Sequence, residues 1–152
     1  MARAARSSAA RLPDPDEPPR RDAMPLAEFA RCLYVSRRLR DGLFPDGLFG
    51  EPAWDILLDL YAAEAEGKPV DVSSACVAAA VPQTTALRYI GRLEAAGLVR
   101  RAPVASDRRR SMLHLTEAGQ ATVESVLVAL CGTWWTQASR CGESGAGDDG
   151  EN

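Results

Sequence analysis

The stretch Ser73–Gly119 constrains the fold of this chain more than any other part of the sequence. A short helical segment runs into the turn Val81–Pro82, and an amphipathic helix is predicted over about 82–96. Two segments with alternating apolar residues follow, 98–102 and 111–115, and an arginine-rich tip joins them. This order of elements is typical of a winged helix-turn-helix, a mainly α fold (α+β) with a two-stranded wing that usually docks on duplex DNA.

Helical spacing of apolar residues predicts three more helices, over about 25–40, 52–66 and 117–138. Thr116 is positioned to cap the last of them, because a threonine before a helix accepts a hydrogen bond from the first turn. We expect the first and last of these helices to flank the winged helix-turn-helix as dimerisation helices. Together the elements predict one DNA-binding and dimerisation domain over residues 24–139.

The two ends of the chain differ in composition from this domain. Residues 1–23 mix four prolines with charged residues, and residues 140–152 are rich in glycine and acid. Segments of this kind bury little apolar surface, so both are predicted to be disordered tails. A transit peptide is the alternative interpretation of the arginine- and serine-rich start.

Three local features have specific expectations. A serine before the short helix accepts a hydrogen bond from its first turn, so Ser73 or Ser74 is the expected cap. Pro82 is expected at the first position of the helix that follows. The connection between the first two helices is too apolar to be fully solvated, and we expect four of its residues to pack on the core: Leu43, Phe44, Leu48 and Phe49.

Charge is unevenly distributed along the chain. The 152 residues have a formal net charge of −3, which by itself would argue against a nucleic-acid partner. The window 88–110, however, contains seven arginines and only two acidic residues. A local basic face on an acidic protein is compatible with DNA binding and limits non-specific association elsewhere.

The helix predicted over 82–96 has two distinct faces. Ala86, Tyr89, Ile90 and Leu93 are spaced to pack inward, whereas the opposite face is polar and basic. Glutamine binds adenine through two hydrogen bonds, arginine reaches guanine or phosphate, and leucine offers an apolar contact to a thymine methyl. An ordinary solvated helix face is the alternative. The candidate DNA-binding residues on this face are Gln83, Thr84, Leu87, Arg88 and Arg92.

The tip of the predicted wing, about 103–110, is the second candidate DNA-binding element. It places Arg108, Arg109 and Arg110 next to one another, and their mutual repulsion would be relieved by phosphates or by a narrow minor groove. We expect Asp107 to accept hydrogen bonds from nearby backbone N–H groups or from an arginine, and so to fix the loop. A solvated charged turn is the alternative.

Residues 70–119 resemble the winged-helix core of the MarR (multiple antibiotic resistance regulator) family of bacterial transcription factors. The matching segments are VPQTTALRYIGRLEAAGLVRR and DRRRSMLHLTEAG, which contain a Leu-Glu-x-x-Gly-Leu-Val run, an Asp-Arg-Arg tip and a Leu-Thr-Glu-x-Gly exit. The resemblance implies a homodimer that binds a pseudo-palindromic operator. It places Gln83, Thr84, Thr85 and Arg88 on the groove or on phosphates, and Arg109 in the minor groove with Asp107 positioning it.

Dimerisation is expected to involve the helices at 25–40 and 117–138. Their apolar residues exceed what a small core needs, and aromatic residues are enriched at interfaces. Packing within one subunit is the alternative. The candidate interface residues are Leu26, Phe29, Leu33, Val126, Leu130 and Trp134.

The remaining residues indicate no catalysis, and no cofactor, metal ion or membrane contact is expected. The four cysteines have no C-x-x-C spacing, His114 is the only histidine, and no nucleophile–base pair or phosphate loop is recognisable. We therefore expect a cytoplasmic transcriptional regulator, associated with the bacterial nucleoid when bound, with no effector that the sequence identifies. The alternatives are a winged-helix protein–protein adaptor and a redox-sensing regulator that uses Cys32 and Cys131.

Overall fold

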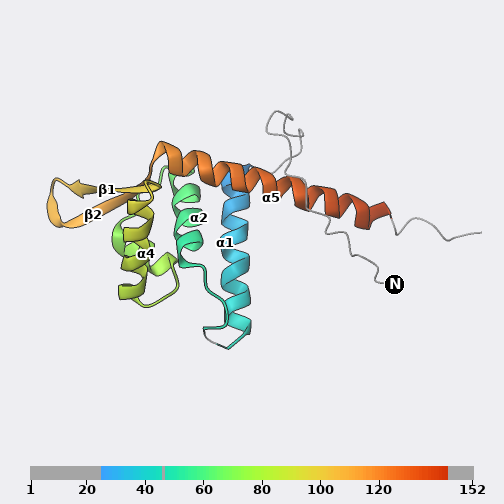
Figure 1. Ribbon diagram of the computed structural model, residues 1–152, viewed down its shortest axis with the longest axis horizontal. Helices are drawn as coiled ribbons and strands as arrows, with labels where there is room; N and C mark the ends of the chain where they lie inside the picture. The colour runs from blue at the N-terminus through green and yellow to red at the C-terminus, as the bar shows by residue number, and fades with distance from the viewer. Residues whose placement is uncertain (1–24, 46, 144–152) are drawn as a thin grey trace, which may run out of the picture.

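The computed structural model describes residues 25–45 and 47–143, without the side chains of Arg108 and of residues 134–143. The described part folds into five helices and a two-stranded antiparallel sheet, which confirms the winged-helix prediction (Figure 1). The tail predicted at 1–23 lies outside the described residues, as do residues 144–152 of the tail predicted at 140–152; residues 140–143 belong to the last helix instead. In chain order the elements are α1 (Leu26–Leu43), α2 (Pro52–Ala65), α3 (Val72–Ala78), α4 (Gln83–Ala95), β1 (Val99–Val104), β2 (Asp107–Leu115) and α5 (Glu117–Glu143).

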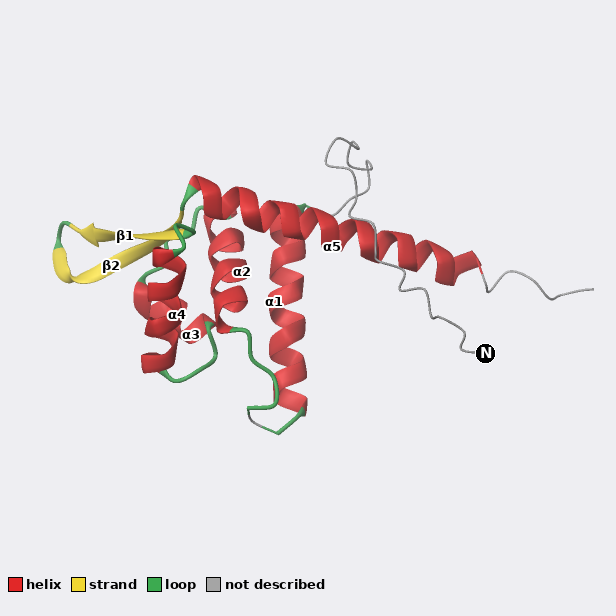
Figure 2. Cartoon of the chain, in the orientation of Figure 1, coloured by secondary structure: helices red, strands yellow, loops and turns green. Residues whose placement is uncertain are grey.

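Helix α2 is the centre of the fold. It contacts α1, α3, α4, β2 and α5, and its residues Ile56, Leu58 and Leu60 are fully buried. A helix that is apolar on most sides is stable only when neighbours cover all of those sides. The other elements are therefore arranged around α2, with α5 lying across the ends of α1 and α2 and the wing projecting on the far side of α4 (Figures 1 and 2).

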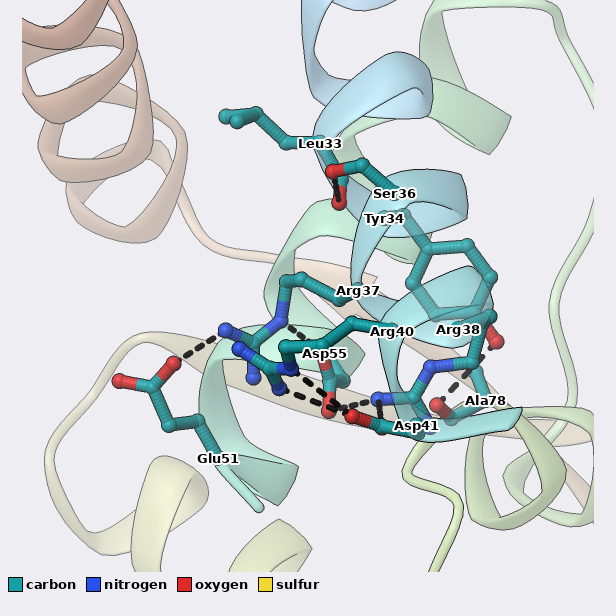
Figure 3. Close-up of polar contacts among 10 residues, drawn as sticks. All are labelled: Leu33, Tyr34, Ser36, Arg37, Arg38, Arg40, Asp41, Glu51, Asp55 and Ala78. Carbon is teal, nitrogen blue, oxygen red and sulfur yellow. Dashed lines mark hydrogen bonds and ion pairs between the residues drawn. The ribbon is translucent and has the colours of Figure 1, made fainter. Parts of the chain in front are cut away.

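A group of charged residues joins α1 to α2 (Figure 3). Asp55, which is only 1% exposed, accepts hydrogen bonds from Arg37 Nε at 2.6 Å and from Arg38 Nη2 at 2.8 Å. Arg37 also pairs with Glu51, and Arg38 with Asp41. Arg37 and Arg38, at the basic end of α1, therefore share a specific buried partner on the next helix.

The start of α5 is fixed by Thr116. Its hydroxyl accepts a hydrogen bond from Gly119 N at 2.9 Å and donates one to Gly97 O at 2.6 Å, which confirms the predicted cap. A Cβ on Gly119 would lie 1.9 Å from the Leu98 carbonyl oxygen, so only glycine allows this close approach. The Thr116–Gly119 segment thereby joins α5 to the base of the wing.

The start of α3 differs from the prediction. The helix begins at Val72, and its N-cap is Asp71, whose Oδ1 accepts a hydrogen bond from Ser74 N at 2.8 Å. Neither Ser73 nor Ser74 is the cap, because the helix starts before both of them. Pro82 likewise lies just outside α4, with an extended ψ of 140°, rather than at its first helical position.

The apolar residues between α1 and α2 do not pack on the core as predicted. Leu43 and Leu48 are 78% and 61% exposed, and the Phe44 and Phe49 rings contact each other at 5.3 Å between centroids. The Arg40 guanidinium lies over the Phe49 ring. Because α1 continues to Leu43, it carries this loop past the end of the core, as the lower part of Figure 2 shows.

Candidate nucleic-acid interface

Helix α4 presents the two faces that its sequence predicts. Ala86, Ile90 and Leu93 are buried against the core. The outer face begins at the first helical residue. In the turn before it, Ala80 adopts a positive φ of 50°, and Pro82 then directs the chain into the helix. Of the predicted contacts, Gln83, Thr84, Leu87, Arg88 and Arg92 are exposed, whereas Thr85 is half-buried.

The wing is a hairpin whose arginines bulge out of the sheet. Pro103 pairs with Ser111, but the next residue, Val104, pairs with Asp107, so residues 108–110 have no partner on β1. The prediction of a long loop over 103–110 is therefore wrong in detail, since β1 runs to Val104 and β2 begins at Asp107. The turn between β1 and β2 is short. The three residues of β2 that do not pair with β1 form a bulge, and they are the arginines.

Asp107 fixes this bulge as predicted. Its Oδ1 accepts a hydrogen bond from the Arg109 backbone N at 2.9 Å. At the base of the hairpin, the Glu64 carboxylate of α2 accepts a hydrogen bond from Leu115 N at 2.9 Å and lies 3.5 Å from His114 Nδ1. Both ends of β2 are thus held by carboxylates.

The arginines of this region fall into two groups. Arg101 pairs with Glu94 at 3.2 Å, and Arg110 pairs with Asp71 at 2.8 Å. Arg88, Arg100 and Arg109 are exposed and have no ion pair among the described residues. Arg92 lies over the Tyr89 ring of its own helix, with 5.6 Å from its Cζ to the ring centroid. Arg88, Arg100 and Arg109 are therefore the part of the basic face that is open to an anion.

Asp71 is the residue of this region that the sequence did not single out. It caps α3 and binds Arg110 with the same carboxylate, and its pKa falls from 3.8 to about 2 because the Ser74 N–H and the Arg110 guanidinium stabilise the charged form. The only signal in the sequence was its position two residues before Ser73, where an aspartate is a favoured cap. The second contact could not be predicted, because Asp71 and Arg110 are 39 positions apart in the sequence.

The candidate dimer residues are placed unevenly. Phe29 is buried within its own chain, and Leu26, Leu33 and Leu130 are partly buried against the same core. Val126 is 39% exposed on α5, whereas the side chain of Trp134 lies outside the described ones. Of the described candidates, Val126 is therefore the most open to a second chain.

The cysteines differ in their surroundings. Cys32 is exposed on α1, Cys131 is half-buried on α5, and Cys76 is buried in the core, where burial raises the pKa of its thiol. Within residues 25–45 and 47–143, no group of histidine, cysteine and acidic side chains has the arrangement of a metal site. None of the helices in those ranges combines the length and the apolarity needed to span a bilayer.

Searches with the sequence match no protein-family description and no curated protein. Solved structures do match. The MepR–DNA complex of S. aureus is 18% identical, with a TM-score of 0.52 over 77% of this chain and 89% of that one. The transcriptional regulator PA4135 is 22% identical, with a TM-score of 0.51 over 78% and 80% of the two chains. The heme sensor PefR of Streptococcus agalactiae, in complex with heme, is 18% identical, with a TM-score of 0.50 over 72% and 76%.

These similarities, together with the order of elements, define the class of the molecule as a winged helix-turn-helix protein. More narrowly, its fold is similar to the folds of PA4135 and MepR, which agrees with the MarR-like fold that the sequence segments around α4 and the wing predicted.

Proposed function

We propose that this protein is a transcriptional regulator that binds double-stranded DNA in a sequence-specific manner and carries out no catalysis. In this proposal α4 enters the major groove and the wing reaches the adjacent minor groove, as winged helices do. The observation that carries it is the set of exposed guanidinium groups on α4 and the wing, Arg88, Arg100 and Arg109, which have no ion pair within the described residues. The MepR structure, with a similar fold, contains DNA.

Helix α4 and the wing would have different roles on DNA. Phosphate contacts set the position of a protein on DNA, and contacts to base edges give specificity. Gln83, Thr84 and Arg88 lie on the first turns of α4 and are exposed, so they would contact base edges and flanking phosphates. Arg109 would reach the minor groove, because Asp107 holds its backbone in the bulge and leaves its side chain unpaired among the described residues.

The proposal includes a homodimer on a pseudo-palindromic operator, located in the cytoplasm. Helix α5 has 27 residues and extends well past α1 (Figure 1). Val126, which is 39% exposed on α5, is the candidate residue that a second copy would cover. A two-fold dimer would place the two α4 helices about 34 Å apart, one turn of DNA.

The first prediction tests this interface with single arginine variants. On a duplex selected from a randomised library by the full chain, Arg109→Ala and Arg88→Ala should each weaken binding by about 1–3 kcal/mol. Because Arg109 would neutralise a phosphate or the minor-groove potential, its loss should also reduce the salt slope by about 0.9. Fluorescence anisotropy titrations at several salt concentrations measure both quantities.

Arg31→Gln is the matched control for this experiment. Arg31 pairs with Asp59 and Glu66 on the side of α1 that faces α2, away from α4 and the wing. Its loss should leave both the affinity and the salt slope unchanged. Unchanged affinity in Arg109→Ala and Arg88→Ala together would remove the proposed interface.

A protein–protein adaptor is the second candidate, and one observation favours it. Leu43, at the end of α1, and three residues of the following loop, Phe44, Leu48 and Phe49, are exposed close together in sequence. Clustered exposed apolar side chains mark protein contacts. A DNA affinity that does not depend on salt, or no retention of any duplex, would favour the adaptor. The salt titration described above therefore separates the two candidates.

A further inference from the structure

Strand pairing with β1 does not fix the bulge in β2. Residues 108–110 lie between the pairs Pro103–Ser111 and Val104–Asp107 and have no partner on β1. Backbone pairing therefore does not set the direction in which these arginines point. Two carboxylates act there instead, with Asp107 accepting a hydrogen bond from the Arg109 backbone and Asp71 accepting one from the Arg110 side chain.

Asp71 reaches the wing from the helix-turn-helix. Its Oδ1 accepts the Ser74 N–H in the first turn of α3, and its Oδ2 accepts Arg110 Nη2, each at 2.8 Å. One side chain thus contacts both α3, the first helix of the helix-turn-helix, and the wing. The Asp71 side chain is 19% exposed and that of Arg110 is 59% exposed, so the carboxylate is the more enclosed member of the pair.

The backbone supports the same junction. Asp71 forms an isolated antiparallel bridge with Met112, and Leu113 N donates a hydrogen bond to Val70 O at 2.9 Å. The segment before α3 therefore lies alongside β2, on the opposite edge from β1. The Asp71–Arg110 pair lies next to this bridge and extends the junction toward the bulge.

We infer that Asp71 is a positioning residue for the wing, and that Arg110 serves as its tether rather than as a phosphate contact. This inference rests on the proposed DNA binding and deepens it, because it separates the wing arginines into two roles. The carboxylate holds Arg110 against α3, so α4 and the bulge approach DNA in one fixed arrangement. Arg109, the neighbour of Arg110, remains available for the groove.

The electrostatics agree with a lasting tether. An unpaired carboxylate near the interface would repel phosphates, and pairing with Arg110 cancels that charge locally. The pKa of Asp71 is lowered to about 2, mainly by the Ser74 N–H and then by Arg110, so the carboxylate stays charged at neutral pH. The tether is therefore present under the conditions in which DNA would be bound.

Asp71→Asn isolates the tether from the helix cap. Asparagine caps a helix about as well as aspartate, so α3 keeps its first turn while the ion pair with Arg110 is lost. Asp71→Asn and Arg110→Ala should each weaken binding to the selected duplex about threefold to tenfold, and the double variant should be no weaker than either single one. Arg110→Lys, which keeps the charge, should restore much of the affinity.

The salt slope separates a tether from a phosphate contact. Arg110→Ala should leave the slope unchanged, whereas Arg109→Ala should reduce it by about 0.9. A reduction of that size in Arg110→Ala would overturn the inference, because it would make Arg110 a phosphate contact. A gain of affinity, or no change, in Asp71→Asn would overturn it as well.

A measurement without DNA keeps the inference separate from the proposed function. In Asp71→Asn, backbone amides of residues 107–113 should exchange with deuterium faster than in the wild type, while those of α4 should not change. Equal exchange in β2 would show that Asp71 does not hold the wing, whatever the chain binds. If the wild type retained no duplex, the proposed function would fail, and the exchange rates would still decide whether Asp71 holds the wing.

Discussion

Asp55 is a buried side chain that joins two helices of the fold. Its two oxygens accept hydrogen bonds from Arg37 and Arg38, so the first helix of the chain is fixed to the central one (Figure 3). Arg37 Nη2 and two nitrogens of Arg38 are buried without a further partner among the described residues. Loss of the carboxylate would therefore leave two guanidinium groups buried next to each other without a buried counter-charge.

Asp55→Asn should accordingly destabilise the protein strongly. Removing one partner of a buried ion pair costs about 3–5 kcal/mol, because the remaining charge is uncompensated. Glu51→Gln is the control, since Glu51 binds the same Arg37 but its side chain is 62% exposed, and its loss should cost less than about 1 kcal/mol. Urea unfolding followed by circular dichroism measures both, and similar costs for the two variants would contradict this role.

Single residues also show the limit of prediction from sequence. The faces of α4 could be predicted, because the spacing of Ala86, Ile90 and Leu93 repeats every helical turn. The Asp71–Arg110 pair could not, since it joins residues that only the fold brings together. The contacts of the outer face of α4 with DNA stay predictions.

At the scale of elements, the junction between the wing and α5 depends on a glycine. Gly119 lies against the Leu98 carbonyl, which also accepts a hydrogen bond from Thr116 N at 3.0 Å. A methyl group there cannot be accommodated by rotating a side chain, because the atoms it would meet belong to the backbone. The Leu-Thr-Glu-x-Gly run of the sequence thus has a steric reason.

Gly119→Ala should destabilise the protein by about 1–3 kcal/mol, the usual cost of overpacking. Gly91→Ala is the matched control, because a Cβ on Gly91, in the middle of α4, would meet no atom within 4 Å. That variant should gain up to about 1 kcal/mol, since alanine is the better helix former. Thermal unfolding of the two variants checks the opposite signs, and a neutral Gly119→Ala would mean that the approach to Leu98 is not a constraint.

The elements were predictable to different degrees for physical reasons. Periodic apolar residues identified the helices, and Thr116 identified the start of α5. The bulge at residues 108–110 was missed, because strand register depends on the turn and on contacts from outside the hairpin. The loop after α1 was misjudged because apolar composition does not show whether a loop faces the core, and here α1 carries it beyond.

At the scale of the whole molecule, helix α5 is the element that the proposed two-fold assembly would use. Helix α4 and the wing lie at one end, and α5 extends away from them at the other (Figure 1). A helix of 27 residues is about 40 Å long, which is more than its own chain covers. In the proposed dimer, a second copy bound along α5 would bury Val126 and place two α4 helices for one operator.

Val126→Glu should shift this assembly toward monomer. A carboxylate buried at an interface without a partner costs several kcal/mol, roughly enough to separate a dimer of moderate affinity. Val77→Glu is the control, because Val77 is 79% exposed on α3, away from α5. Sedimentation velocity over a range of concentrations should give a dimer for the wild type and the control. A Val126→Glu protein that remains fully dimeric would contradict the proposed interface.

In the proposed complex, two copies of α4 and the wing bind one face of a DNA duplex. A hydroxyl-radical footprint of the protein on its selected duplex tests this arrangement. We expect two half-sites of protected backbone whose centres lie about 10–10.5 base pairs apart, each flanked by a protected minor groove where Arg109 would lie. A single protected half-site would contradict the dimer, and the absence of protection on every selected duplex would contradict DNA binding by this fold.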